Sequence, residues 1–136
     1  RIFAAEPEVF CFSLHAANNY PAEKAVSDLD IALPDGTGDE AYLAALAGGL
    51  DRVLARPRPA IAFYNAGVDV WGGDRLGRLG LSLEGIRARD RMVIGRVRAL
   101  GIPLVCVIGG GYDNDPERLA ERHAIVFEEA AAALAS

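Results

Sequence analysis

Residues 59–78 of the chain read PAIAFYNAGVDVWGGDRLGR. The first part, Ala60–Tyr64, is a near-continuous apolar run, and such runs are typical of strands buried on both faces of a parallel sheet. The second part turns through several glycines and places a carboxylate, Asp69, shortly after the end of the strand. A carboxylate held among glycines at the end of a strand fits a ligand site better than it fits a core.

The rest of the chain repeats this strand pattern and alternates it with helical patterns. Two further apolar runs predict strands at Val9–Leu14 and Pro103–Ile108. Apolar residues at helical spacing predict helices over about Asp39–Ala55, from Ser82 to just before Gly101, and from Asp115 onward. Ser82 and Asp115 are good N-caps, Pro116 suits the first turn, and Gly101 is a good C-terminal cap. We therefore predict one α/β domain over residues 1–136, with about three parallel strands and three helices, and a polar loop over residues 16–38.

Three side chains follow the ends of the predicted strands. These are His15, Asp69 and Tyr112, the last of which comes directly after Gly109-Gly110-Gly111. Ligands of open α/β sheets bind at the carboxyl ends of the strands, so we expect these three residues to share one edge. Glycine allows the backbone to approach a ligand closely, which suits a loop that presents a tyrosine there.

The motifs of these loops are similar to those of a known enzyme family. Tyr-Asn-Ala-Gly-x-Asp (residues 64–69), Gly-Asp-Arg-Leu-Gly (73–77) and Gly-Gly-Gly-Tyr (109–112) resemble the carboxyl-terminal half of the zinc-dependent histone deacetylases, in particular class IV and its bacterial relatives. Supporting segments occur in the same order at residues 12–15, 19–21, 27–30 and 33–38. The resemblance implies a three-layer α-β-α, arginase/deacetylase-like fold with a parallel sheet, of which this chain would be a carboxyl-terminal fragment.

The resemblance also implies a site and a reaction. Asp69 would be a zinc ligand and Tyr112 the catalytic residue that donates to the substrate oxyanion. Gly110 and Gly111 would line the substrate channel. Potassium ions would be held by Ser13 and Leu14 at one position and by Phe3 and Val9 at a second. The substrate would be an acetylated lysine or an acetylated small amine, and the cofactors would be Zn²⁺ and K⁺.

Part of the family's machinery has no counterpart in this sequence. The His-His pair and the Asp-x-His metal motif are missing, and the two histidines, His15 and His123, lie in neither motif. We expect those motifs upstream of Arg1, and we expect the isolated chain to be inactive. Both histidines are interpreted as structural, while Asp74 and Arg75 are interpreted as fixing the turn that points Asp69 inward.

Other interpretations stay open on the residues alone. Asp69 also suits the cap of a turn, and a bare Gly-Gly-Gly-Tyr also suits a surface turn. The alternative function is a catalytically incomplete α/β fragment that serves as a structural or partner-binding module. Such a fragment would form a homo-oligomer or associate with the missing amino-terminal half through an unpaired sheet edge. A nucleotide-binding module is disfavoured, because the glycines form neither a P-loop nor a dinucleotide fingerprint.

Composition narrows the partners and the compartment. The chain has 136 residues and a net charge of −5, which argues against nucleic acid as a partner. Most of the seven arginines between Arg75 and Arg98 are assigned to the exposed side of the second helix, and the acidic residues between Asp28 and Glu40 to a solvated loop and an N-capped helix. No apolar run approaches the ~20 residues of a membrane helix. Two cysteines, Cys11 and Cys106, lie in apolar runs without ligand spacing, which suits a cytoplasmic protein.

Overall fold

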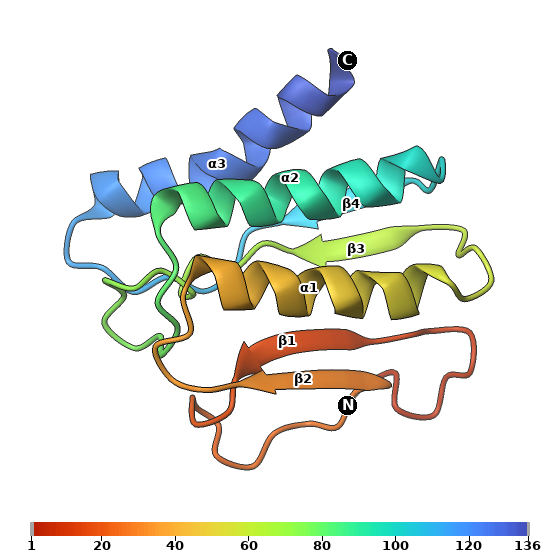
Figure 1. The fold of residues 1–136 in the computed structure, drawn as a ribbon, viewed down its shortest axis with the longest axis horizontal. Helices are drawn as coiled ribbons and strands as arrows, with labels where there is room; N and C mark the ends of the chain where they lie inside the picture. Colours follow the sequence, from red (N-terminus) through yellow and green to blue (C-terminus); the bar gives the residue numbers. More distant parts are fainter. Residues whose placement is uncertain (1, 136) are drawn as a thin grey trace.

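The chain forms parallel strands that alternate with helices. The computed structural model describes residues 2–135. In chain order the elements are β1 (Phe12–Ala16), β2 (Leu29–Leu33), α1 (Asp39–Leu54), β3 (Ala62–Asn65), α2 (Leu83–Ala99), β4 (Leu104–Val107) and α3 (Pro116–Leu134). β1 pairs with β2 and β3 pairs with β4, both in parallel, and all the strand arrows point the same way in Figure 1. The predicted α/β class with parallel strands is confirmed.

β2 is a strand that the sequence interpretation missed. Residues 16–38 were expected to form a loop, but Leu29–Leu33 pairs along β1 in the register Phe12↔Leu29 to Ala16↔Leu33. Leu29 and Leu33 are buried, whereas Asp30 and Ala32 between them are exposed. This short alternating pattern is that of a half-buried strand, which has no continuous apolar run of strand length to mark it in the sequence.

β1 also begins and ends later than predicted. The backbone N–H of Cys11 donates to the Asp28 carboxylate at 2.8 Å, and the strand begins at the next residue. At its other end, β1 continues through His15 to Ala16. His15 lies inside the strand, not past its end as expected.

The helix ends follow the predicted capping residues. The Ser82 hydroxyl accepts from the Gly85 backbone N–H at 2.9 Å, and the Asp115 carboxylate accepts from the Glu117 N–H at 3.0 Å. Gly101 follows α2 with φ of +64°, a conformation that favours glycine. α1 begins differently, because Gly38 has no capping side chain, and the Asp39 carboxylate instead accepts from the Ser82 backbone N–H at 2.8 Å.

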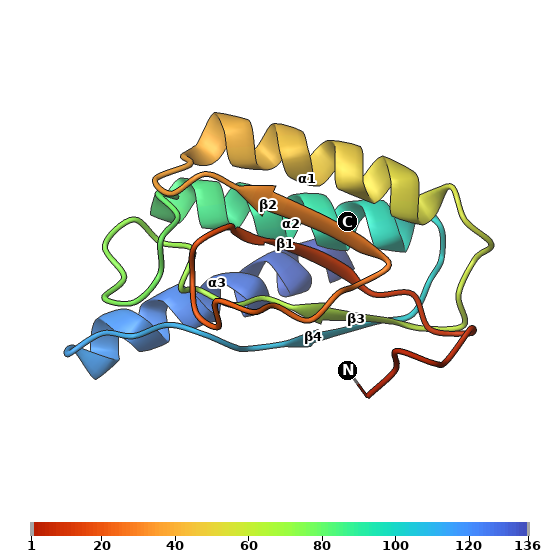
Figure 2. The ribbon, with the colours of Figure 1, turned by 90° about the horizontal axis from the view of Figure 1, so that it is seen from below.

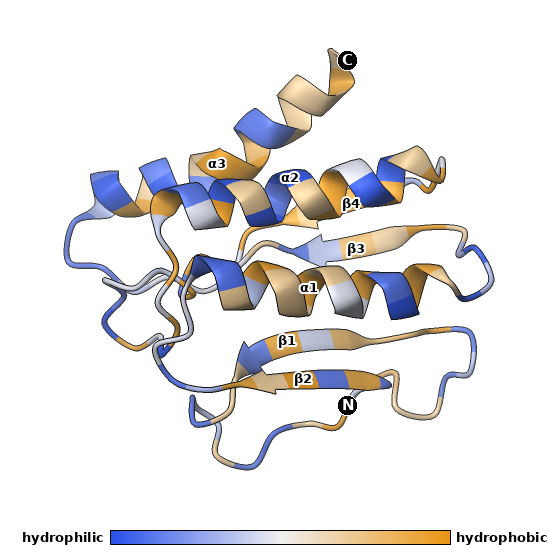
Figure 3. Ribbon diagram, viewed as in Figure 1, coloured by the Kyte–Doolittle hydropathy of each residue, from blue (hydrophilic) through white to orange (hydrophobic). Residues whose placement is uncertain are grey.

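The helices lie together on one side of the strands, as Figure 2 shows. Their buried faces and the strands share a core that contains Leu46, Leu50, Ile86, Val93 and Val97. β3 and β4 carry hydrophobic colouring along much of their length in Figure 3, and their residues alternate between half-buried and exposed. The second helical layer of the expected three-layer architecture is not among residues 2–135. Within the same range, no helix has the length and apolarity to cross a membrane.

Candidate active site

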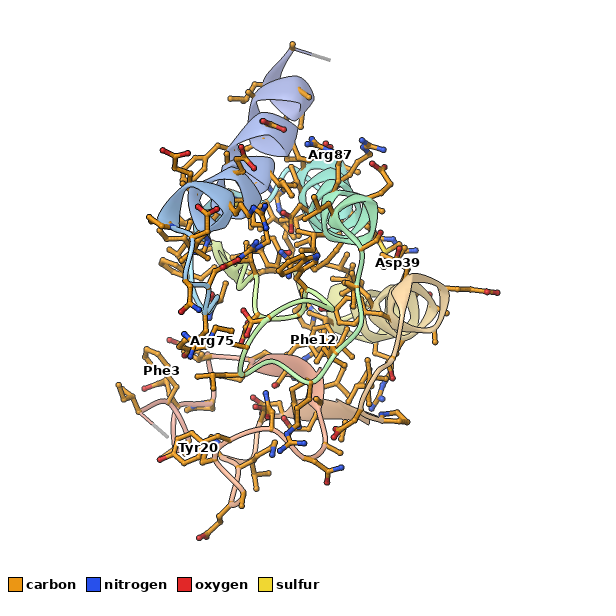
Figure 4. The ribbon with its side chains drawn as sticks, turned by 90° about the vertical axis from the view of Figure 1, so that its left-hand side faces the viewer. Phe3, Phe12, Tyr20, Asp39, Arg75 and Arg87 are labelled. Atoms are coloured by element: carbon orange, nitrogen blue, oxygen red, sulfur yellow. The ribbon has the colours of Figure 1, made fainter. Side chains whose placement is uncertain are left out.

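The loops that follow β3 and β4 meet at one edge of the molecule. The Ala66 N–H donates to the Val107 carbonyl at 2.8 Å, and the Val68 N–H donates to the Gly109 carbonyl at 3.0 Å. These bonds continue the strand pairing into the loops that carry Asp69 and Tyr112. Figure 4 looks onto this edge, with Arg75 near the centre of the view. As predicted, the two loops share one edge of the strands.

The Asp69 carboxylate lies against the triple glycine. A Cβ at Gly110 would overlap Asp69 Oδ1, and a Cβ at Gly67 would lie 3.0 Å from the same oxygen. Gly110 also has φ of +58°, so a side chain there is excluded both by space and by backbone conformation. The glycines are therefore required for the carboxylate to occupy this position.

The environment of Asp69 opposes its ionisation. Burial of this half-buried carboxyl raises its pKa, and the negative charge of Asp74 raises the pKa further. A backbone hydrogen bond and the positive charge of Arg89 act in the opposite direction without cancelling the rise. A cation placed at the carboxylate would act against this rise in pKa, because opposite charge favours the ionised form.

Tyr112 is held through its backbone, and its side chain is about half exposed. Its N–H donates to Asp74 Oδ2 at 2.7 Å, and its carbonyl accepts from the Arg75 N–H at 3.2 Å. Asp74 Oδ1 accepts from the Leu76 N–H at 2.9 Å and from the Gly77 N–H at 2.8 Å. Asp74 thus closes its own turn and joins it to the tyrosine loop.

Asp74 and Arg75 therefore do more than the sequence analysis predicted, because their turn contacts the Tyr112 loop as well as the Asp69 backbone. A Cβ at Gly77 would overlap the Asp69 carbonyl, so this turn does rest on the Asp69 backbone. The same turn also holds Tyr112, and Arg75 Nη1 donates to the Asn114 side chain at 2.6 Å. One short turn positions both candidate residues.

α3 supports the tyrosine loop from behind. Arg122 donates to the Asp113 carboxylate at 2.6 Å and lies over the Trp71 ring at 4.2 Å. His123 Nε2 would lie 3.5 Å from a Cβ at Gly111. Burial and the charge of Arg122 lower the pKa of His123, which favours its neutral form. His123 packs against the loop that carries Tyr112, in agreement with its interpretation as a structural histidine.

The predicted potassium ligands lie in β1 and in the coil before it. The Ser13 hydroxyl and His15 Nδ1 are 2.8 Å apart, and Leu14 pairs with Ile31 of β2. In the coil, the Phe3 carbonyl accepts from the Glu6 N–H at 3.0 Å, and the Val9 N–H donates to the Glu6 carbonyl at 3.1 Å. These contacts neither require nor exclude an ion, so the potassium assignments stay predictions.

The described residues contain one predicted zinc ligand, Asp69. Among residues 2–135, no group of three or more His, Cys, Asp or Glu side chains could hold a metal ion. A catalytic zinc has three protein ligands, and a carboxylate is a normal one. Asp69 fits such a ligand by its chemistry and by the space that Gly110 leaves for it. The other two ligands would have to lie outside the described residues.

One buried group beside the site was not predicted. Arg89 and Asp90 of α2 are only 3% and 1% exposed, so Arg89 is an exception to the expectation that most of these arginines lie on a solvated face. Arg89 Nε donates to Asp90 Oδ1 at 2.8 Å, and the Tyr64 hydroxyl donates to the same oxygen at 2.5 Å. A signal was present, because Asp90 shares the apolar stripe of α2 with Ile86 and Val93.

Comparisons with known proteins agree with these motifs. A family model described as Histone deacetylase domain matches residues 1–129. An uncharacterized protein of Picosynechococcus sp. is 43% identical over 129 residues, which are 95% of this chain and 43% of that protein. Histone deacetylase 2 of Arabidopsis thaliana is 34% identical over 113 residues, which are 83% of this chain and 27% of that protein. The crystal structure of an HDAC homolog from Aquifex aeolicus has a TM-score of 0.74 and 26% identity, over 90% of this chain and 35% of that one. The chain thus spans less than half the length of these relatives.

Proposed function

Because the chain belongs to the histone deacetylase domain family, we propose that it forms the carboxyl-terminal part of a catalytic domain that hydrolyses an N-acetyl amine. The substrate class is an acetyl-lysine side chain or an acetylated small amine. The observation that supports this proposal best is the Asp69 carboxylate, which lies against Gly110 in a loop tied to the Tyr112 backbone. A carboxylate confined by glycines beside a tyrosine loop does not stabilise a hydrophobic core. The same arrangement suits a site at the edge of the sheet that binds a cation and a carbonyl group.

Asp69 would hold a zinc ion together with two ligands from the rest of the domain. When bound, zinc supplies Lewis-acid polarisation of the amide carbonyl and lowers the pKa of water. The raised pKa of Asp69 agrees with this role, because a neighbouring cation would favour the ionised carboxylate. The rest of the domain would also supply the general base, since neither His15 nor His123 is placed in the two loops.

Tyr112 would stabilise the charge that develops on the substrate. Its hydroxyl would donate a hydrogen bond to the carbonyl oxygen as that oxygen becomes negative. The side chain is free enough to do so, because it is about half exposed while its backbone is fixed by Asp74. Gly110 and Gly111 would line the approach of the acyl group, where the lack of side chains leaves room for a narrow substrate.

The second candidate function is a structural or partner-binding module without catalysis. It is favoured by the exposed apolar side chains of β3 and β4, among them Phe63 at 73% exposure and Val107 at 43%. In this case Asp69 would only shape its turn. The two candidates differ in what removal of the Asp69 carboxylate does to zinc binding.

The test uses a polypeptide that carries a complete deacetylase domain with this chain as its carboxyl-terminal part. We expect Asp69→Ala to lose bound zinc, measured by atomic emission, and to lose hydrolysis of an acetyl-lysine peptide and of an acetylated polyamine. Tyr112→Phe is expected to keep its zinc while its kcat falls about 10²–10³-fold. Asp51→Ala is the matched control, because Asp51 lies on α1 and pairs with Arg96 of α2, not with a residue of the two loops. Zinc content and turnover that are unchanged in Asp69→Ala would leave the partner-binding module as the function.

A further inference from the structure

A buried polar network connects β3 and α2 to the loop that carries Asp69. The Asp90 carboxylate accepts hydrogen bonds from the Tyr64 hydroxyl of β3 and from its helical neighbour Arg89. The side chains of Arg89 and Asp90 are 4% and 1% exposed, so the ion pair is shielded from water. The guanidinium of Arg89 is thereby held in one place relative to the strand.

The same guanidinium fixes the peptide that joins Gly67 to Val68, the residue before Asp69. Arg89 Nη1 donates to the Gly67 carbonyl at 2.6 Å. The other side of that peptide is also bonded, because the Val68 N–H donates to the Gly109 carbonyl at 3.0 Å. The peptide plane between Gly67 and Val68 is therefore held at both its oxygen and its nitrogen, and the next residue is Asp69.

Small rotations of this plane would move the carboxylate. Gly67 packs so closely that a Cβ there would lie 3.0 Å from both Asp69 Oδ1 and the Gly109 carbonyl oxygen. Val68 is only 1% exposed, so the backbone has little room to compensate. The direction of the Asp69 side chain is thus coupled to the hydrogen bond from Arg89.

Stability alone does not account for a buried ion pair at this place. The cost of removing both charges from water is similar to their attraction, and well-packed apolar residues often serve as well. Arg89 Nη2 is moreover buried without a hydrogen-bond partner among the described residues, which adds to the cost. The ion pair does fix the orientation of the Arg89 side chain, because the planar guanidinium donates in defined directions to Asp90 and to the Gly67 carbonyl.

We propose that Arg89, oriented by Asp90 and Tyr64, is a positioning residue for the metal site, because it sets the Gly67–Val68 peptide and so aims the Asp69 carboxylate at the zinc. This role rests on the proposed function of Asp69. Arg89 acts through the backbone and contacts neither metal nor substrate.

The test measures zinc affinity in the complete domain, by competition with a chromophoric chelator, together with the visible absorption of the cobalt-substituted protein. Arg89→Met combined with Asp90→Leu removes both charges and keeps the volume, so no unpaired charge stays buried. We expect zinc affinity to fall about 10–100-fold, the usual effect of losing a partner that orients a ligand, and the cobalt spectrum to shift. Arg96→Met is the matched control, because Arg96 of the same helix donates to the Ala47 carbonyl of α1, away from this loop. It should bind zinc as the unmodified protein does.

The outcomes separate this inference from the proposed function. If Asp69→Ala binds zinc normally, the proposed function fails and the positioning role fails with it. If Asp69→Ala loses zinc while the double variant keeps the affinity and cobalt spectrum of Arg96→Met, only the positioning role is overturned. If the double variant does not fold, Arg89→Lys decides, because lysine keeps the charge beside Asp90 but cannot reproduce the two directed donors. Unchanged zinc affinity in Arg89→Lys would then overturn the inference.

Discussion

At the scale of single residues, Asp69 lies where it suits the proposed role of a metal ligand and where its ionisation costs folding stability. Its burial and the nearby charge of Asp74 raise its pKa, so the metal-free fold bears the cost of an ionised carboxylate. The glycine at 110 brings the backbone close enough to confine that carboxylate. Residues that serve a site in this way commonly reduce stability.

This cost predicts a pH-dependent effect of Asp69→Asn on the metal-free domain. Because the pKa of Asp69 is higher in the folded state than in the unfolded state, the folded state binds more protons between the two values. The free energy of unfolding therefore decreases as pH rises through that window. Asp69→Asn should remove this slope and be more stable than the unmodified domain at neutral pH, with the difference shrinking in acid. Urea unfolding in the presence of a chelator, at a series of pH values, measures it.

Asp51→Asn is the control for this measurement, since Asp51 is an exposed carboxylate on α1. It should not show the same gain in stability at neutral pH. An Asp69→Asn variant that is less stable than the unmodified domain at neutral pH would contradict the electrostatic account. In that case the carboxylate would be needed by the fold and not merely tolerated.

How far the sequence predicts the site depends on the kind of residue. Asp69 and Tyr112 were singled out because each follows an apolar run and lies in a motif, and the structure places their loops at one edge while their roles stay predictions. The burial of Asp90 was indicated only by its place on the apolar stripe of α2. The hydrogen bond from Arg89 to the Gly67 carbonyl could not be predicted, because it depends on how α2 packs against the loop after β3. The contact between Asp74 and the Tyr112 N–H was likewise out of reach, since it joins loops 38 residues apart.

At the scale of elements, α2 and α3 are joined by a cluster of charges at the rim of their apolar contact. Glu129 of α3 accepts from Arg87 at 2.9 Å and from Arg91 at 2.9 Å, both on α2. Arg87 also pairs with Glu128 at 2.6 Å, and its position on α2 is marked in Figure 4. The Glu129 side chain is 7% exposed, so it depends on these arginines for its solvation.

We predict that Glu129→Gln loosens this helix pair in a pH-dependent way. The hydrogen bond from Arg91, and then that from Arg87, lower the pKa of Glu129. Its contribution is thus present above the unfolded-state pKa and is lost as pH falls through the folded-state value. The expected loss at neutral pH is about 1 kcal/mol, since solvent screens the partly exposed arginines. Thermal unfolding at neutral and acidic pH measures it.

Glu121→Gln on the same helix is the control, because Glu121 is exposed and should change stability little. Equal effects of the two substitutions, or an effect of Glu129→Gln that persists unchanged in acid, would show that the cluster does not join the helices. A result of this kind would leave the apolar contact between α2 and α3 as the main attachment.

The elements themselves were largely predictable. Helix ends were set by local chemistry, and Ser82, Gly101 and Asp115 behave as their types predict. The deacetylase-like fold expected from the motifs is confirmed by the superposition on the Aquifex aeolicus homolog. β2 was missed because a five-residue strand with one buried face carries little apolar signal, and only its pairing with β1 identifies it.

At the scale of the whole molecule, the helices cover one side of the strands and leave an apolar surface on β3 and β4. This surface, here called the open sheet face, consists of Ile61, Phe63, Val105, Val107 and Ile108, which are 37–73% exposed. Contiguous apolar patches on proteins commonly mark contacts with other chains or segments. The family relatives are more than twice as long as this chain, so the rest of such a domain is a natural cover for this face.

We predict that residues 1–136 alone self-associate through the open sheet face. Burying Phe63 and its neighbours against a second copy removes apolar surface from water, worth roughly 25 cal/mol per Å². Phe63→Lys combined with Val105→Lys should shift the chain toward monomer in sedimentation velocity at equal concentration. Phe127→Lys is the control, because Phe127 is 61% exposed but lies on α3, outside that face.

Adding the amino-terminal part of a related deacetylase domain as a separate polypeptide should also replace self-association by a mixed complex. If the double lysine variant associates as strongly as Phe127→Lys, the open sheet face is not the contact surface, and the partner-binding alternative loses its main support.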